Sequence, residues 1–198
     1  MTETRQRLPA GERRQAVLDT ACRVFTRSSY RGATTAEIAR EAGISEPILY
    51  RHFGSKRDLY LACIEQAFAE LCAVAEEARR SDPRGCLGTV VNAYMSSEAR
   101  VRLVDLWIQA LGIAAEDEVI AQALKRQIRE LQRFFAELVR EQQKLGIVHE
   151  DRDPVAEAWI FIASGFLKTF DHRLGGLLGP DLERVRAERR RWLMVDPA

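Results

Sequence analysis

The sequence predicts an all-α protein with a small N-terminal three-helix domain and a larger C-terminal helical domain. Apolar residues recur at spacings of three and four along the chain, and no segment shows the strict apolar/polar alternation of a half-buried strand. Capping residues, glycines and prolines divide the chain into helix-sized segments. The hydrophobic fraction of 46% is sufficient for a packed core.

The first 60 residues predict three short helices. Apolar residues share one broad face over residues 11–28, which is helical spacing. The segment Thr34–Glu37 has the pattern of a capping box, which marks a helix start, and Gly43 ends that helix. A third helix fits residues 46–52, with Ser45 as its N-cap.

The rest of the chain predicts six further helices. A second capping-box pattern at Ser55 opens a long helix that runs to about Arg80. We place the domain boundary inside this helix, with residues 1–58 in the N-terminal domain and 59–198 in the C-terminal domain. The remaining five helices are expected over about 84–97, 99–113, 117–145, 154–174 and 180–194.

Charge is unevenly divided along the chain. In total, 30 Lys and Arg stand against 29 Asp and Glu, a net charge of +1, which excludes a uniformly basic coat. The first 60 residues hold 11 of the basic and 7 of the acidic residues, so the positive region is N-terminal and suits a polyanion. Arg5, Arg7, Arg13 and Arg14 form either a basic arm that reaches phosphate or a solvated tail, and the tail is favoured for the first two.

Signals for several other protein classes are missing from the sequence. No nucleotide-binding glycine loop, zinc-protease motif or nucleophile elbow is present, and the four cysteines lack metal-binding spacing. We therefore expect no enzymatic activity, no metal and no cofactor. The longest apolar run, 159–170, is too short for a membrane span, and the charged N-terminus lacks the apolar region of a secretory signal. We expect a cytoplasmic protein with reduced thiols and no membrane contact.

The segment 34–59 carries the main functional signal. A short helix, a turn at residues 43–45 and a second short helix form the layout of a helix-turn-helix, whose second helix enters the DNA major groove. Helix N-termini nearby attract anions through their free N–H groups and the helix dipole. The candidate DNA-binding residues are Thr34, Thr35, Ser45, Glu46, Pro47, Ile48, Tyr50, Arg51, His52 and Lys56.

This segment resembles the DNA-binding domain of the tetracycline-repressor-like (TetR) family of bacterial transcription regulators. The resemblance implies three short helices for DNA, followed by a divergent helical domain for ligand binding and dimerisation. It covers nearly the first 60 residues, and the later residues match only in length and helical pattern. The matching residues are Ala42-Gly43, Ser45, Leu49-Tyr50, His52-Phe53 and Ser55-Lys56 followed by Leu59.

The resemblance also implies roles for individual residues. Arg51 is the main candidate for base recognition, because a guanidinium makes a bidentate contact to guanine. Ala36 stands where some relatives carry a base-reading arginine, so we expect weak readout from the first helix of the motif. The positions implied to contact phosphates are Thr35, Tyr50, His52 and Lys56, and those implied to face base edges are Glu46, Pro47, Ile48 and Arg51.

The last two predicted helices carry more apolar surface than a monomer buries. A helix that is apolar nearly all round is buried on most sides, so we expect both helices to meet their copies in a four-helix dimer interface. The alternative is that 154–174 is simply the central core helix. A dimer would place two recognition helices about 34 Å apart, the spacing of successive major grooves. The predicted interface residues are Trp159, Ile162, Phe166, Phe170, Leu182, Val185 and Trp192.

Inward-looking residues of the C-terminal domain predict either an apolar cavity or a filled core. If a cavity is present, its ligand is mainly apolar or aromatic, and Tyr94, Gln109 and Gln127 are its candidate polar partners. The resemblance implies that this ligand is an inducer. The candidate lining residues are Tyr94, Leu103, Trp107, Leu111, Gln127, Phe134 and Trp159.

The sequence therefore favours a sequence-specific DNA-binding regulator. We expect a ligand-responsive repressor that binds a palindromic operator in double-stranded DNA as a homodimer. The alternatives are an activator, a helical small-molecule-binding protein and a helical protein-interaction module. Salt-sensitive DNA binding separates a regulator from an enzyme and from a protein-interaction module, because phosphate contacts release counterions.

Overall fold

The computed structural model describes residues 10–82 and 84–195 of the chain. Within these ranges the chain forms nine α-helices, and the extended pairing is confined to one isolated bridge between Val148 and Met194. No described helix has both the length and the hydropathy needed to cross a bilayer. The helices are α1 (Ala10–Gly32), α2 (Thr35–Glu41), α3 (Glu46–His52), α4 (Lys56–Ser81), α5 (Cys86–Ser96), α6 (Glu98–Ala114), α7 (Glu118–Lys144), α8 (Pro154–Arg173) and α9 (Asp181–Leu193).

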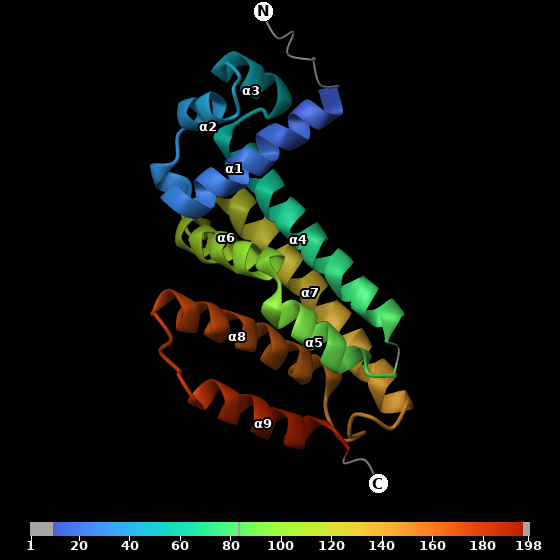
Figure 1. Cartoon of the computed structure of the whole chain (residues 1–198). Coiled ribbons are helices and arrows are strands. Elements are labelled where there is room, and N and C mark those ends of the chain that lie inside the picture. Colours follow the sequence, from blue (N-terminus) through green and yellow to red (C-terminus); the bar gives the residue numbers. More distant parts are fainter. Residues whose placement is uncertain (1–9, 83, 196–198) are drawn as a thin grey trace, which may run out of the picture.

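The predicted all-α fold is confirmed, and every predicted helix is present with ends that shift by only a few residues. In Figure 1, α1 to α3 form a small bundle at one end of the molecule, and α4 leads from it into the larger helical array. In that array α4 packs against α5 and α6, and α7 packs against α6 and α8. The buried apolar cluster runs through both parts, from Val17 in α1 to Leu193 in α9.

Helix α1 is interrupted near its end. Ser29 has φ 64° and ψ 167°, a conformation outside the helical region that a non-glycine residue adopts only with support from its surroundings. Gln109 of α6 supplies that support. Its Oε1 accepts a hydrogen bond from the Tyr30 N–H (3.0 Å), and its Nε2 donates to the Phe25 carbonyl (3.2 Å). Gln109 therefore joins α6 to α1, and its predicted role as a polar partner inside a ligand cavity was wrong.

Side-chain caps are present at the predicted starts of α2 and α4. The Thr34 hydroxyl accepts from the Glu37 N–H (3.1 Å), and the Ser55 hydroxyl accepts from the Asp58 N–H (3.1 Å). Ser45 occupies the predicted N-cap position of α3, but its side chain makes no cap hydrogen bond. The orientation of α3 therefore depends on packing against α2 and on the turn between them.

Candidate nucleic-acid interface

The turn between α2 and α3 is built by one glycine and a small apolar core. Gly43 has φ 67°, the left-handed conformation that ends α2, and the Ile44 N–H then donates to the Ala39 carbonyl (3.0 Å). Ile38 and Leu49 are fully buried where the two helices meet. Leu49 is the single buried residue of α3. The other faces of this seven-residue helix are thus available for contact outside the domain.

The predicted DNA-contacting residues lie on or beside these free faces. On α3, Tyr50 is 44% exposed, Pro47 and Arg51 are exposed, and Glu46, Ile48 and His52 are half-buried. Thr34 and Ser45 are exposed at the starts of α2 and α3, and Thr35 and Lys56 are half-buried. The fold thus brings all ten residues to the α2–α3–α4 end of the molecule, and their individual contacts with DNA stay predictions.

Three of these residues form a hydrogen-bond network that the sequence did not predict. The Thr35 hydroxyl donates to Glu46 Oε1 (2.5 Å) and lies 3.1 Å from the Tyr50 hydroxyl. The Glu46 carboxylate is thereby fixed beside two hydroxyls that are candidates for phosphate contact. Because a carboxylate repels phosphate, this geometry places an unfavourable charge at the edge of the proposed interface.

Basic side chains around α3 rest on aromatic rings. The Lys56 ammonium lies 4.8 Å from the centre of the Tyr30 ring, and the Arg14 guanidinium lies 4.7 Å from the centre of the Phe53 ring. Burial lowers the pKa of the Lys56 ammonium. Phe53 itself is buried, as expected for a core aromatic. Arg5 and Arg7 lie outside the described residues.

Helices α1 and α4 are tied to the C-terminal part of the chain by polar contacts with α6 and with the turn between α6 and α7. Arg31 at the end of α1 pairs with Glu116 (2.7 Å), and Arg57 at the start of α4 pairs with Asp117 (3.4 Å). The buried Tyr60 hydroxyl also donates to the Leu106 carbonyl of α6 (2.7 Å). With Gln109, these contacts connect α6 to both helices that carry the α2–α3 unit.

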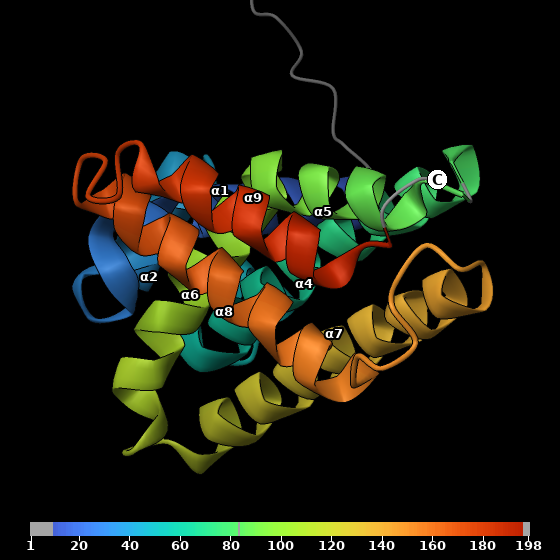
Figure 2. The same cartoon turned by 90° about the horizontal axis from the view of Figure 1, so that it is seen from below.

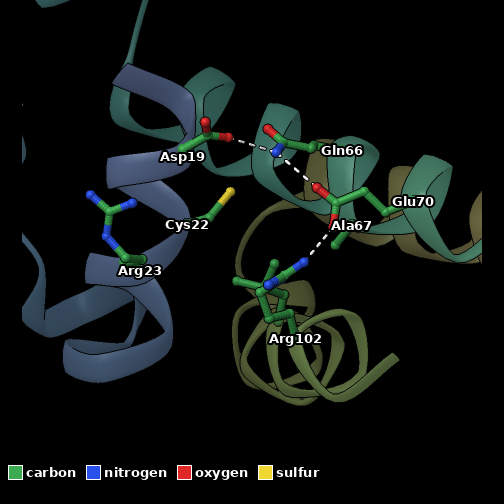
Figure 3. A pocket seen from close by; sticks show the side chains of 8 residues that line it. Asp19, Cys22, Arg23, Gln66, Ala67, Glu70 and Arg102 are labelled. Carbon is green, nitrogen blue, oxygen red and sulfur yellow. Dashed lines mark hydrogen bonds and ion pairs between the residues drawn. The ribbon is translucent and has the colours of Figure 1, made fainter. Parts of the chain in front are cut away.

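A polar cleft of about 260 Å³ lies between α1, α4 and α6. In Figure 3, Gln66 stands between Asp19 and Glu70, to which its Nε2 donates at 2.8 and 3.0 Å, and Arg102 reaches Glu70 from α6. The cleft was not predicted, because its residues come from three helices far apart in sequence. Its lining residues are Asp19, Cys22, Arg23, Gln66, Ala67, Glu70, Arg102 and Leu106.

The candidate ligand-binding residues are divided between the core and the surface. Tyr94, Leu103, Trp107 and Gln127 are buried and Phe134 is half-buried, but Leu111 is 53% exposed and Trp159 is 36% exposed. The predicted inward orientation of Leu111 and Trp159 was therefore wrong. Trp107 Nε1 donates to Gln127 Oε1 (3.0 Å), so that amide oxygen is already engaged inside the core. The two described pockets contain none of these seven residues.

The predicted dimer-interface residues lie on α8 and α9, which run side by side along one face of the molecule (Figures 1 and 2). Trp159, Phe170, Val185 and Trp192 are exposed, and Phe166 and Leu182 are half-buried. Ile162 points into the core and is only 3% exposed, so its assignment to the interface was wrong. The exposed members leave large apolar side chains uncovered on both helices in the isolated chain.

The N-terminal region of the chain is similar in sequence to known proteins. Residues 17–63 match the family model for bacterial regulatory proteins of the tetR family. The transcriptional activator FasR of Mycolicibacterium smegmatis is 41% identical over 90 residues, which is 44% of this chain and 41% of that protein. The regulator BetI of Agrobacterium fabrum is 34% identical over 99 residues, 48% of each protein. This chain thus spans about half the length of the curated relatives it matches.

The similarity in fold to a solved structure extends over most of the chain. A protein from Saccharomonospora viridis, determined in complex with choline, superposes with a TM-score of 0.74. It covers 93% of this chain and 99% of its own chain at 20% identity. Together these findings confirm the predicted resemblance and the predicted two-part helical fold.

Proposed function

We propose that this chain, whose residues 17–63 match the family model for bacterial regulatory proteins of the tetR family, is a ligand-responsive repressor that binds a palindromic operator as a homodimer. The proposal rests on the exposure of α3, which buries Leu49 and leaves Pro47, Tyr50 and Arg51 exposed. Residues 1–58 form the DNA-binding domain, and residues 59–198 form the ligand-binding and dimerisation domain.

DNA recognition in this proposal depends on α3 and on the starts of α2 and α4. Helix α3 enters the major groove, where Arg51 contacts a base and Glu46, Pro47 and Ile48 lie near base edges. The hydroxyls of Thr34, Thr35, Ser45 and Tyr50, together with His52 and Lys56, face the phosphates. The N-termini of α2 and α4 add favourable dipoles for the same anions.

Substitutions of Arg51 and Lys56 test this assignment. Arg51→Ala is expected to lose roughly 1–3 kcal/mol of preference at one base pair, because base contacts carry sequence information. Lys56→Ala is expected to weaken binding to all duplexes about equally and to reduce the dependence on salt, because phosphate contacts are independent of sequence. Binding curves on a set of single-base operator variants, recorded at several salt concentrations, measure both. An even loss across all sequences for Arg51→Ala would contradict its role in base recognition.

Glu46→Gln is expected to tighten DNA binding severalfold at low salt. The amide retains an oxygen that accepts from the Thr35 hydroxyl, but it removes the charge that lies 2.5 Å from that hydroxyl. Loss of repulsion acts on every duplex and fades as salt rises, which anisotropy titrations with labelled DNA can measure. If binding instead weakens at a single cytosine-containing position, Glu46 reads a base and does not repel phosphate.

Dimerisation in this proposal uses α8 and α9. Both helices carry exposed apolar side chains that a second copy would cover, and exposed apolar patches commonly mark protein interfaces. A symmetric pair of molecules would present two α3 helices to successive major grooves.

Regulation in this proposal passes through α6 and α4. A ligand in the C-terminal core shifts the position of α6, and the contacts of Gln109 and Glu116 transmit that shift to α1. Helix α4 continues directly from the core to the DNA-binding domain. The ligand changes DNA affinity only by its different affinity for the two arrangements. The structural relative in complex with choline supports a small-molecule effector.

Activation of transcription is the second candidate function. FasR of Mycolicibacterium smegmatis, which is 41% identical over the matched residues, is named an activator. Both modes use the same DNA contacts. Transcription in vitro from a promoter that contains the selected operator separates them, because a repressor lowers transcript yield and an activator raises it.

A further inference from the structure

The C-terminal domain buries a guanidinium group that has no part in the proposed DNA contacts or dimer interface. Arg100 of α6 is only 2% exposed and shares a buried stripe with Leu103, Val104 and Trp107. Its Nη1 donates to the Gly165 carbonyl (3.2 Å) and to the Thr169 hydroxyl (3.0 Å), both neutral acceptors on α8. Its Nε is buried and has no hydrogen-bond partner.

No carboxylate balances this charge within the part of the chain that the structure describes. Asp105 is close enough to affect Arg100 electrostatically, but its carboxylate pairs with Arg173 (2.8 Å). Burial lowers the pKa of the Arg100 guanidinium, which reflects its loss of hydration. A buried charge without an ionic partner is unfavourable for folding, so its presence indicates a use other than stability.

The Thr169 hydroxyl contacts the Arg100 guanidinium, and an aromatic residue, Tyr94, lies against the neighbouring Gly165. The Thr169 hydroxyl donates to the Gly165 carbonyl (3.1 Å). Tyr94 of α5 lies against Gly165, where a Cβ atom would fall only 2.2 Å from the Tyr94 hydroxyl oxygen. The Tyr94 ring meets Phe135 edge-on at 5.3 Å. One end of this core is therefore polar and cationic, and the adjoining region is aromatic.

We propose that Arg100 binds the carboxylate group of an amphipathic effector, with Tyr94 and Thr169 as further hydrogen-bond partners and the aromatic rings around the apolar part. The inference rests on the proposed ligand-responsive function and specifies the chemical class of its ligand. It keeps Tyr94 but replaces the two glutamines expected from the sequence, because Gln109 hydrogen-bonds to α1 and Gln127 hydrogen-bonds to Trp107.

The position of Arg100 also connects this ligand to DNA binding. Arg100 lies near the start of α6, and Gln109 lies near its end. A carboxylate that binds Arg100 would therefore shift α6. Gln109 on the same helix would pass the shift to α1, because it hydrogen-bonds to Phe25 and Tyr30 on either side of the interruption at Ser29.

Matched pairs of carboxylates and primary amides test the proposal on the full chain without DNA. The probes are benzoate, phenylacetate, hexanoate and decanoate, each paired with its amide, and choline as a cation. Calorimetric titration and thermal unfolding are expected to show binding and a raised Tm for at least one carboxylate, and neither for its amide or for choline. Equal binding of acid and amide, or no carboxylate binding in the series, would overturn the proposal.

Variants then assign the binding to Arg100. Arg100→Met is expected to weaken carboxylate binding by about tenfold to a hundredfold, the effect of losing a charge-assisted contact. Arg102→Met is the matched control, since Arg102 lies on the same helix and pairs with Glu70 on the other side. Arg100→Lys is expected to keep the preference for acid over amide with reduced affinity. Unchanged binding by Arg100→Met, or an equal loss in Arg102→Met, would contradict the assignment.

Stability and DNA binding are measured on the same variants. Because the guanidinium lacks an ionic partner, Arg100→Met is expected to keep or raise Tm without ligand. A marked fall in Tm would instead indicate a structural role, and the acid-over-amide preference of Arg100→Lys would then decide between the two. Failure of the wild-type chain to bind duplex DNA would defeat the proposed regulator function, and failure to prefer carboxylates would defeat only this inference.

Discussion

Replacing Phe170 by Glu is expected to produce a folded monomer that no longer binds the operator. Phe170 is 47% exposed on α8, one of the two helices of the proposed dimer interface. A carboxylate at this position costs little in the isolated chain but is strongly unfavourable in a dry interface. Loss of the second half-site contact is expected to reduce operator affinity about 100-fold or more. Sedimentation measures the oligomeric state, and anisotropy with labelled operator measures binding.

Leu111→Glu is the control for this experiment. Leu111 is an equally exposed apolar residue, but it lies on α6 rather than on α8 or α9. It is expected to leave both dimerisation and DNA binding unchanged. If Phe170→Glu remains dimeric, or if both substitutions disrupt the dimer alike, the proposed interface is in the wrong place.

Leu49→Ala is expected to abolish DNA binding through the fold of the N-terminal domain. The Leu49 side chain is fully buried, and α3 has no other buried residue. Removing it leaves a cavity and costs about 2–5 kcal/mol in the free energy of unfolding. A helix of seven residues does not persist without packing, so α3 loses its orientation.

Denaturant unfolding and DNA titration of Leu49→Ala test this prediction together with sedimentation. The dimer is expected to persist, because α8 and α9 are distant from α3 in the fold (Figure 1). The neighbouring Ile48→Ala, at a half-buried position, is expected to cost less stability. Operator binding by Leu49→Ala at wild-type affinity would show that DNA is contacted elsewhere.

Local sequence patterns predicted the helices because helix formation depends on local features. Apolar spacing, the caps at Thr34 and Ser55 and the left-handed Gly43 each act within a few residues, and all were found. The resemblance of one short segment also predicted which end of the molecule carries the helix-turn-helix.

Tertiary polar contacts could not be predicted in the same way. The hydrogen bond between Gln109 and Tyr30 joins residues 79 positions apart in the sequence. The one between Arg100 and Thr169 joins residues 69 positions apart. Their partners depend on how whole helices pack, which periodicity does not specify. One signal was present: Arg100 occurs in register with Leu103 and Trp107, which marks it as a buried charge if that face points inward.

For the apolar helices, the sequence predicted the residue range better than it predicted which side faces the core. Helix α8 is apolar around most of its circumference, so the pattern could not say which side faces the core. Ile162 took the inward side and Trp159 the outward side, and the packing of α7 against α8 decides between them.

The decisive experiment is selection of the purified full chain against random duplex DNA, followed by titration of the enriched sequences over a salt series. A dimer that reads DNA through α3 is expected to enrich a palindromic motif with half-sites about 34 Å apart, with an affinity that falls steeply as salt rises. An absence of any enriched motif, with weak binding that is insensitive to salt, would contradict the proposal that α3 reads DNA as part of a dimer.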